Sequence, residues 1–167
     1  MSEKSWEKLD LADLIKQPSE PVDDDQKPVS QRSMTRRVAV QALYQWTLNP
    51  QDTYLIEKQF YEEGWLSGTD RVWFKDILNQ VTQDVALLDD TYAPFLDRSV
   101  KLINPVERCI LRLAVYELRD QVQVPSKVII NEAVELTKHF GAEDAHKYIN
   151  GVVDKVAKQL RPVEFGA

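Results

Sequence analysis

Residues 104–160 read NPVERCILRLAVYELRDQVQVPSKVIINEAVELTKHFGAEDAHKYINGVVDKVAKQL, and this stretch decides the fold. It opens with a helix start in which Asn104 can cap, Pro105 fits the first helical position and Glu107 completes a capping box. The apolar residues of the helix that follows, through about Arg119, lie on more than one side. Such a helix must be covered nearly all round, so we expect it at the centre of the domain.

Two more helices are predicted within the same stretch. Pro125 breaks the first helix and Ser126 is expected to cap the next, whose apolar residues recur at i, i+4, i+7 and i+11. Gly141 is expected to end that helix, because a left-handed residue after a helix is least costly as glycine. Asp144 can cap a final helix, and the short connection makes the two helices close neighbours. The apolar stripe of the final helix consists of Ile149, Val152, Val153, Val156 and Leu160.

Helices are also predicted upstream of this stretch. A first core helix carries a buried stripe of Ala39, Leu43 and Trp46, and it stops before Pro50. A second helix spans residues 52–63 and is ended by a glycine. Its apolar residues are Leu55, Ile56 and Phe60.

The clearest amphipathic helix begins near Asp70, and its apolar residues recur at helical spacing from Phe74 to Leu88. An acidic pair and a proline then mark a break. A short further helix is expected to carry Tyr92, Phe95 and Leu96. No segment shows strand alternation bounded by hairpin turns, so the expected fold class is all-α.

Length and composition are those of one soluble domain. The chain has 167 residues, of which 43% are hydrophobic and 29% charged. No apolar run approaches the roughly 20 residues that a membrane span needs, and the N-terminus is typical of neither a signal nor a transit peptide. Cys109 is the only cysteine, which excludes an internal disulfide and a cysteine-based zinc site. We expect a cytoplasmic protein.

Charge is unevenly distributed along the chain. The net charge is −6, and residues 1–31 contain four lysines and eight acids, a net charge of −4. The remainder, with 17 basic and 19 acidic residues, has a net charge of −2. A nearly neutral domain can present one basic face, so any contact with a polyanion should be small and specific.

Three motifs near the C-terminus resemble the signature of the NusB family of bacterial transcription antitermination factors. They are NEAVEL at residues 131–136, HFGAED at 139–144 and KYINGVVDK at 147–155. The similarity extends back through LRLAVYEL at 111–118 to AVQALY at 39–44, and it covers roughly residues 32–162. The resemblance implies the NusB arrangement, about seven helices in two small packed three-helix bundles.

The resemblance also implies a non-enzymatic function without a cofactor. Such a factor binds the single-stranded boxA element of ribosomal RNA transcripts together with ribosomal protein NusE. The pair associates with elongating RNA polymerase and other Nus factors. The expected organisation is an acidic, flexible extension at residues 1–31, an RNA-binding domain at 32–162 and a tail at 163–167. We expect a monomer or a weak homodimer.

Three arginines, Arg32, Arg36 and Arg37, begin the first core helix. The dipole at a helix N-terminus prefers anions, so arginines are locally unfavourable there. Such a conflict is expected of residues that are held in place for a ligand with phosphates, and a solvated first turn is the alternative. The resemblance likewise implies that these arginines bind RNA.

The resemblance places four further residues on the RNA side: Phe95, Asp144, Lys147 and Tyr148. Aromatic rings stack on unpaired bases, and Tyr148 lies just off the apolar stripe of its helix, which favours exposure. For Phe95, core packing is an equal alternative. Asp144 would accept a hydrogen bond from a base amino group, and helix capping explains it equally well.

Two residues are candidate contacts with the protein partner. The resemblance implies that Glu107 meets basic residues of NusE, and its capping role is the structural alternative. Lys101 lies where related sequences can carry an acid. This difference affects the detailed charge pairing and not the choice of partner.

Metal and catalytic sites are not expected. His139 and His146 lie seven residues apart across a helix break, with no accompanying cysteine or HExxH pattern. No three residues with catalytic roles are predicted to converge. Gly151 lies inside a helix, where glycine costs about 1 kcal/mol relative to alanine. Close helix packing is the favoured cause, and a needed approach to the backbone is the alternative.

Other interpretations stay open at this point. The acidic extension is either a disordered segment that keeps the protein soluble or a tail that folds over the basic residues and competes with RNA. Two further alternatives are a domain of a ribosomal RNA cytosine methyltransferase and a homodimeric scaffold that buries its own RNA face. A helix-turn-helix DNA binder is disfavoured, because Glu143 and Asp144 would enter the groove.

Overall fold

Residues 29–140 and 143–166 are described by the structure, a computed structural model of the chain. Within these ranges every regular element is a helix, which confirms the all-α fold class. The chain divides into two compact units, Met1–Asn79 and Gln80–Ala167. The apolar residues of segment 5–16 predict a short helix, and this segment, like nearly all of the acidic extension, lies outside the described residues. No described helix is long and apolar enough to cross a membrane.

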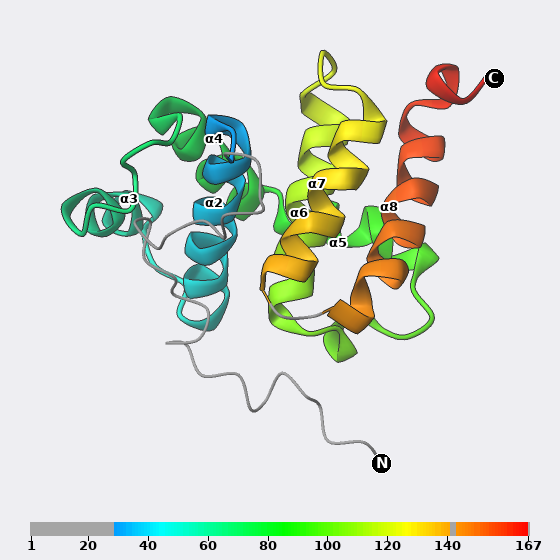
Figure 1. Cartoon of the computed structure of the whole chain (residues 1–167). Helices are drawn as coiled ribbons and strands as arrows, with labels where there is room; N and C mark the ends of the chain where they lie inside the picture. The colour runs from blue at the N-terminus through cyan, green and yellow to red at the C-terminus, as the bar shows by residue number, and fades with distance from the viewer. Residues whose placement is uncertain (1–28, 141–142, 167) are drawn as a thin grey trace. The chain divides into compact units, whose positions relative to one another are not determined.

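The amino-terminal unit contains α2 (Gln31–Leu48), α3 (Thr53–Glu62) and most of α4 (Arg71–Gln83) (Figure 1). The hydroxyl of Ser30 caps α2 by accepting a hydrogen bond from the Ser33 amide at 3.1 Å. After α3 the chain turns at Gly64, whose φ of +83° is a left-handed conformation that favours glycine. The bounds of α2 and α3 agree with the predicted ones.

The core of this unit is built around two aromatic rings. Phe60 of α3 and Phe74 of α4 stack with their centroids 5.9 Å apart, and Ile56 is fully buried beside them along α3. Leu55 is exposed, so it does not contribute to the core with the other apolar residues of α3. Trp46 is half-buried, which makes it the weakest member of the predicted stripe on α2.

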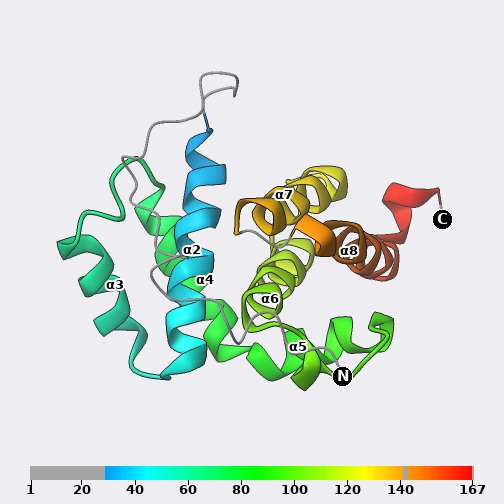
Figure 2. The ribbon, with the colours of Figure 1, turned by 60° about the horizontal axis from the view of Figure 1, so that its bottom comes forward.

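The carboxyl-terminal unit is organised around one helix, as predicted. Its α-helices are α5 (Val85–Tyr92), α6 (Pro105–Asp120), α7 (Ser126–His139) and α8 (His146–Leu160). Four short 3-10 helices are η2 (Ala93–Phe95), η3 (Val100–Leu102), η4 (Glu143–Ala145) and η5 (Pro162–Phe165). Figure 2 shows α6 between α5, α7 and α8, and it contacts all three. Twelve of its sixteen residues are buried, which confirms its central position.

The long amphipathic helix predicted from Asp70 to Leu88 is wrong as a single element. Helix α4 ends at Gln83 and α5 begins after Asp84, whose φ of −103° and ψ of 18° interrupt the helix. The carboxylate of Asp84 makes no capping bond and instead accepts a bond from Arg119 at 2.8 Å. The predicted short helix at residues 92–96 is also wrong, since it is the end of α5 followed by η2.

Three predicted helix caps are wrong as well. Asn104 does cap α6, because its Oδ1 accepts from the Val106 amide at 2.8 Å. No capping-box bond from Glu107 accompanies it within the described residues. Ser126 is the first residue of α7 and not its cap. Asp144 lies in η4, and α8 begins only at His146, without a side-chain cap.

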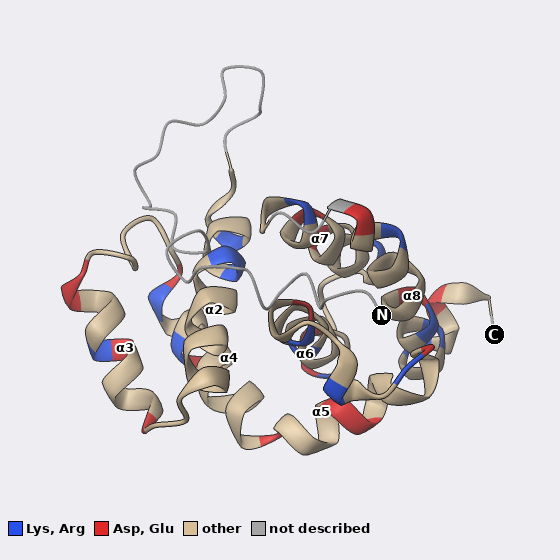
Figure 3. Cartoon of the chain, turned by 90° about the horizontal axis from the view of Figure 1, so that it is seen from below, with Lys and Arg blue, Asp and Glu red and all other residues tan. Residues whose placement is uncertain are grey.

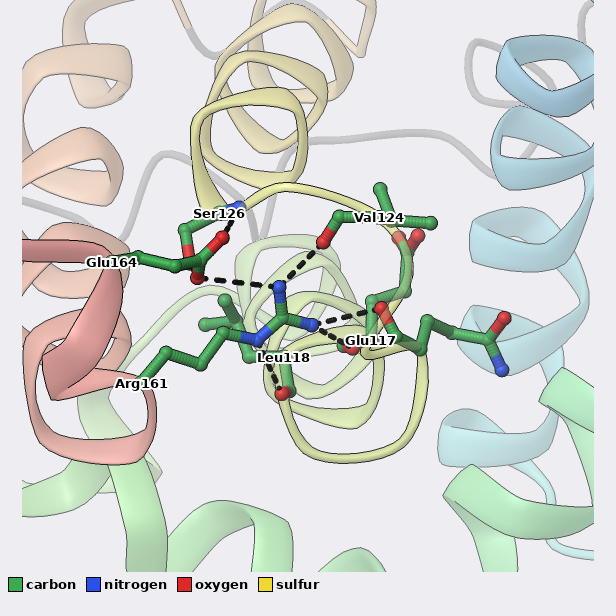
Figure 4. Close-up of polar contacts among 7 residues, drawn as sticks. Glu117, Leu118, Val124, Ser126, Arg161 and Glu164 are labelled. Atoms are coloured by element: carbon green, nitrogen blue, oxygen red, sulfur yellow. Dashed lines mark hydrogen bonds and ion pairs between the residues drawn. The ribbon is translucent and has the colours of Figure 1, made fainter.

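Two residues that follow α8 bind the ends of neighbouring helices: Arg161 the C-terminal end of α6, and Glu164 the N-terminal end of α7 (Figure 4). The Glu164 carboxylate accepts hydrogen bonds from the amide (3.2 Å) and hydroxyl of Ser126. Positive charge therefore lies at the end of α6 and negative charge at the start of α7, as the helix dipoles prefer. The guanidinium of Arg161 donates to the carbonyl oxygens of Glu117, Leu118, Gln121 and Val124.

Helix α8 packs on the unit through its predicted apolar stripe, with one exception. Leu160, the last member of the stripe, is 37% exposed. Gly151 has no neighbouring atom within 4 Å of the position that a Cβ would occupy, so close packing does not explain this glycine. The predicted end of α7 at Gly141 falls outside the described residues; α7 ends at His139.

Candidate nucleic-acid interface

The three arginines lie in the first two turns of α2, with no acidic residue in the first turn. Figure 3 shows basic residues gathered at this end of the helix. They are not simply a solvated turn, since Arg32 and Arg37 are half-buried and Arg36 is only 2% exposed. All three belong to the amino-terminal unit.

Trp73 of α4 holds two of these arginines and was not singled out in the sequence. The Cζ atoms of Arg32 and Arg36 lie 3.8 Å and 5.1 Å from the centroid of its ring. Trp73 Nε1 and Arg32 Nη2 are buried and have no hydrogen-bond partner among the residues that the structure describes. Buried donors of this kind cost free energy, so the pair is suited to an acceptor such as a phosphate oxygen. Trp73 precedes Ile77 by four residues on the buried face of α4, so helical periodicity accounts for its burial but not for its contacts with Arg32 and Arg36.

Tyr148 is the best-defined candidate in the carboxyl-terminal unit. It is half-exposed in the first turn of α8, as its place beside the apolar stripe predicted. Its hydroxyl accepts a hydrogen bond from the Asp97 amide at 3.1 Å and donates one to Asp97 Oδ1 at 2.9 Å. The ring is therefore fixed at its far end to the segment that follows η2.

Arg98 completes this arrangement. It donates two hydrogen bonds to Asp97, and its Cζ lies 5.1 Å from the centroid of the Tyr148 ring. The bonds that Arg98 and Tyr148 donate lower the pKa of the Asp97 carboxyl to about 2, so this group is ionised at neutral pH. Burial raises the pKa of the Tyr148 hydroxyl, which stays protonated and able to donate. Neither Asp97 nor Arg98 was predicted, because a single bonded pair in a loop leaves no periodic signal.

The other predicted RNA residues of this unit are accessible. Phe95 lies in η2, which packs against α8, and it is half-buried and so not a full core residue. Lys147 is exposed directly beside Tyr148, and Asp144 is exposed in η4 with no capping duty. The structure thus groups these four residues around the start of α8. The role of each in RNA binding stays a prediction.

Glu107 is a half-buried carboxylate in the first turn of α6. Burial raises its pKa, and the charge of Arg98 partly offsets this effect. Lys101 is exposed in η3, and no ion pair joins it to Glu107 within the described part of the chain. A half-buried carboxylate without a bound cation is suited to a basic partner, because a partner's charge would stabilise its ionised form.

The two histidines lie in half-buried positions at the end of α7 and the start of α8. His139 is half-buried edge-on against the ring of Phe140, with centroids 5.0 Å apart, and His146 is the half-buried first residue of α8. Within residues 29–140 and 143–166, no group of three or more His, Cys, Asp or Glu side chains is placed to hold a metal ion. The accessible side chains of the candidate interface are arginines, a lysine, aromatic rings and the carboxylates of Asp97 and Asp144.

Comparisons with known proteins agree with this chemistry. The model of the NusB family matches residues 33–158. The transcription antitermination protein NusB of Hydrogenovibrio crunogenus is 51% identical over 156 residues, which are 93% of this chain and 97% of that protein. The NusB protein of Pasteurella multocida is 47% identical over 135 residues, 81% of this chain and 94% of that protein. The first match leaves 7% of the chain unaligned, so the similarity begins earlier than residue 32 and enters the acidic segment.

Solved structures show the same likeness. T. maritima NusB superposes with a TM-score of 0.70 at 27% identity, and covers 85% of this chain and 99% of that chain. A structure of the antitermination factors NusB and NusE in complex with double-stranded RNA gives a TM-score of 0.67 at 26% identity, over 76% of this chain and 96% of that chain. The described residues thus share the all-α fold of solved NusB structures, as the sequence motifs implied.

Proposed function

The chain belongs to the NusB family of transcription antitermination proteins, which is not a family of enzymes, and from this premise we propose that it binds boxA-type single-stranded RNA together with NusE. The observation that carries the proposal is the half-exposed Tyr148 ring, held by its hydroxyl and flanked by the exposed Lys147. A fixed ring beside a cation is a stacking site for an unpaired base next to its phosphate. The NusB and NusE complex with RNA among the similar structures supports both partners.

The proposed RNA contacts divide into phosphate and base contacts. Arg32, Arg37 and Lys147 bind phosphates, and Tyr148 stacks on a base with Phe95 beside it on η2. Asp144 is the predicted acceptor for a base amino group. Arg36 is also a predicted RNA contact, and because it is buried against Trp73 its proposed contribution is to hold the basic cluster in shape.

NusE is proposed to bind at the start of α6. The half-buried Glu107 carboxylate gains a cationic neighbour in the complex, which returns its raised pKa toward the ordinary value. Lys101, exposed on η3, lies close in the chain and adds a charge that favours acidic groups of the partner. The variant Glu107→Gln should weaken NusE binding, whereas Glu135→Gln, an exposed acid on α7, should not.

The central test is a titration of labelled boxA-type RNA with the full chain, with and without NusE. About three neutralised phosphates give a slope of log affinity against log salt of roughly −2 for a single strand. The variant Tyr148→Ala should lose about 5- to 150-fold in affinity without a change in slope, because stacking on one base is worth about 1–3 kcal/mol. NusE and RNA should strengthen each other's binding.

Two controls make this test decisive. A scrambled strand of equal length measures non-specific binding, and an RNA duplex measures the contribution of paired RNA, which the similar NusB–NusE structure contains. Equal affinity for the boxA-type and scrambled strands would contradict the proposal. So would a salt slope near zero, since no phosphates would then be bound.

The wider role follows from the same proposal. The RNA-bound pair associates with elongating RNA polymerase and other Nus factors in the cytoplasm, where it favours read-through of terminators. The protein acts as a monomer or a weak homodimer. A sizing column run at several concentrations tests this, and a concentration-dependent dimer that loses RNA binding would favour the self-buried scaffold instead.

A further inference from the structure

Arg98 lies beside the ring that is proposed to stack on RNA. Its Cζ is 5.1 Å from the Tyr148 centroid, and its side chain is 48% exposed. Its Nε donates to Asp97 Oδ1 at 2.6 Å and its Nη2 to Asp97 Oδ2 at 3.1 Å. An accessible cation and an accessible ring therefore meet at one point of the carboxyl-terminal unit.

Asp97 holds both neighbours at once. Its Oδ1 accepts from the Tyr148 hydroxyl as well as from Arg98, and its amide donates to the same hydroxyl. Asp97 and Tyr148 are 51 positions apart in the chain. Side chains that are already ordered lose less entropy when a ligand binds, so this arrangement favours binding.

Arg98 retains donors for a ligand. A guanidinium carries five N–H groups in a planar fork that matches phosphate oxygens. Two of them bond to Asp97, and the other three have no partner among the described residues. An exposed ion pair contributes little to stability, so the fold alone gives small reason for this arrangement.

We propose that Arg98 is a further RNA-binding residue, which holds the phosphate adjoining the base that stacks on Tyr148, and that Asp97 positions both side chains. The inference rests on the proposed function, since it requires an unpaired base on the Tyr148 ring. The strand would then cross the start of α8 with its base on the ring and its phosphate on the guanidinium.

The test is a titration of labelled boxA-type RNA with full-length Arg98→Ala at several salt concentrations. Affinity at low salt should fall about five- to tenfold, because one phosphate contact is lost and the Asp97 charge is left unneutralised. With Arg98 as a fourth phosphate contact the wild-type slope becomes roughly −2.8, and in Arg98→Ala it should be less steep by about 0.7, the value for one phosphate of a single strand. Arg98→Lys should keep the wild-type slope and recover only part of the affinity, because an ammonium lacks the fork.

Lys158 provides a matched control near the other end of α8. It is an exposed cation that pairs with Asp154 at 2.9 Å and lies 5.8 Å from the ring centroid of Phe165. Lys158→Ala therefore removes a cation that, like Arg98, has an acidic partner and a nearby ring, but that lies away from Tyr148. Its RNA affinity and salt slope should equal those of the wild type.

The outcomes separate this inference from the function on which it rests. Wild-type affinity and slope for Arg98→Ala, with Tyr148→Ala weakened, overturn the role of Arg98 alone. A wild-type affinity for Tyr148→Ala overturns the proposed function and this inference with it. Weaker NusE binding by Arg98→Ala with unchanged RNA binding would assign the residue to the protein partner. Should Arg98→Ala melt early, the affinity and slope of Arg98→Lys decide the question.

Discussion

The two ends of helix α8 use the same residue types in opposite ways. At its start, Tyr148 bonds to Asp97, which pairs with Arg98. Just beyond its end, Arg161 and Glu164 bond to the ends of α6 and α7. The side chain of Arg98 is 48% exposed and that of Arg161 is 9% exposed.

The difference lies in how many donors each arginine has left. All five N–H groups of Arg161 have acceptors: four carbonyl oxygens and, at 3.5 Å, the Glu164 carboxylate. Arg98 uses only two of its five within the described residues. A saturated arginine stabilises the fold, whereas an unsaturated one at the surface is available to a ligand. The four predictions below test this contrast.

The largest effect is expected from Arg161→Ala. It removes charge-assisted hydrogen bonds and leaves carbonyl groups at the end of α6 without their donor, so the free energy of unfolding should fall by about 3 kcal/mol. Urea denaturation measures the change. Arg98→Ala is the matched control, and its change should stay within about 0.5 kcal/mol. Equal losses for the two variants would remove the contrast between the ends of α8.

A smaller, pH-dependent effect is expected from Glu164→Gln. The bonds donated by Ser126, with Arg161 nearby, lower the pKa of Glu164 in the folded state. Its stabilising contribution is therefore full above the ordinary glutamate pKa and is lost as pH falls through the folded value. The melting temperature of Glu164→Gln should lie below that of the wild type at pH 7, and the gap should narrow toward pH 3. A gap independent of pH would show that the charge of Glu164 is not what caps α7.

A substitution in the middle of α8, Gly151→Ala, should raise the stability of the protein and not lower it. Since no atom lies near the missing Cβ of Gly151, Gly151→Ala should raise the free energy of unfolding by about 0.5–1 kcal/mol. Thermal melting measures the gain. Gly151 is one turn beyond Tyr148 on the same face of the helix. Weaker RNA binding by the stabilised variant would show that the RNA-binding surface of α8 reaches this turn. Unchanged binding would show that the surface is limited to the first turn.

The smallest change in stability is expected from Tyr148→Phe. It removes only the hydroxyl at the exposed end, so the free energy of unfolding should change by less than about 0.5 kcal/mol. RNA affinity should fall less than for Tyr148→Ala, because the ring remains but is no longer held by Asp97. A large loss of stability would show that this end of α8 also serves the fold.

The helices themselves were predictable from the sequence where a local pattern specifies them. The cap at Asn104 and the all-round burial of α6 follow from a short stretch of residues, and both are confirmed. The predictions at Ser126 and Asp144 failed, because each assumed that a helix is capped by its own neighbouring residue. For α7 the capping carboxylate comes from Glu164, 38 positions away, and no local pattern records such a contact.

The candidate site shows the same limit. Exposure of Tyr148 could be predicted from its place beside an apolar stripe, and the arginines from their conflict with the helix dipole. Trp73 and Asp97 could not, because each acts through contacts between residues distant in the chain, at 3.8 Å to Arg32 and 2.9 Å to Tyr148. Sequence patterns thus indicate which side chains are available, and the structure shows what holds them.

The late position of Arg161 in the chain has a consequence for biosynthesis. It lies 44 residues after Glu117, whose carbonyl it binds. At about 5–20 residues per second, the ribosome adds Arg161 roughly 2–9 seconds after Glu117. Throughout that interval the last carbonyl groups of α6 lack the donor that binds them in the folded protein, so the end of α6 can be completed only after Arg161 has been added.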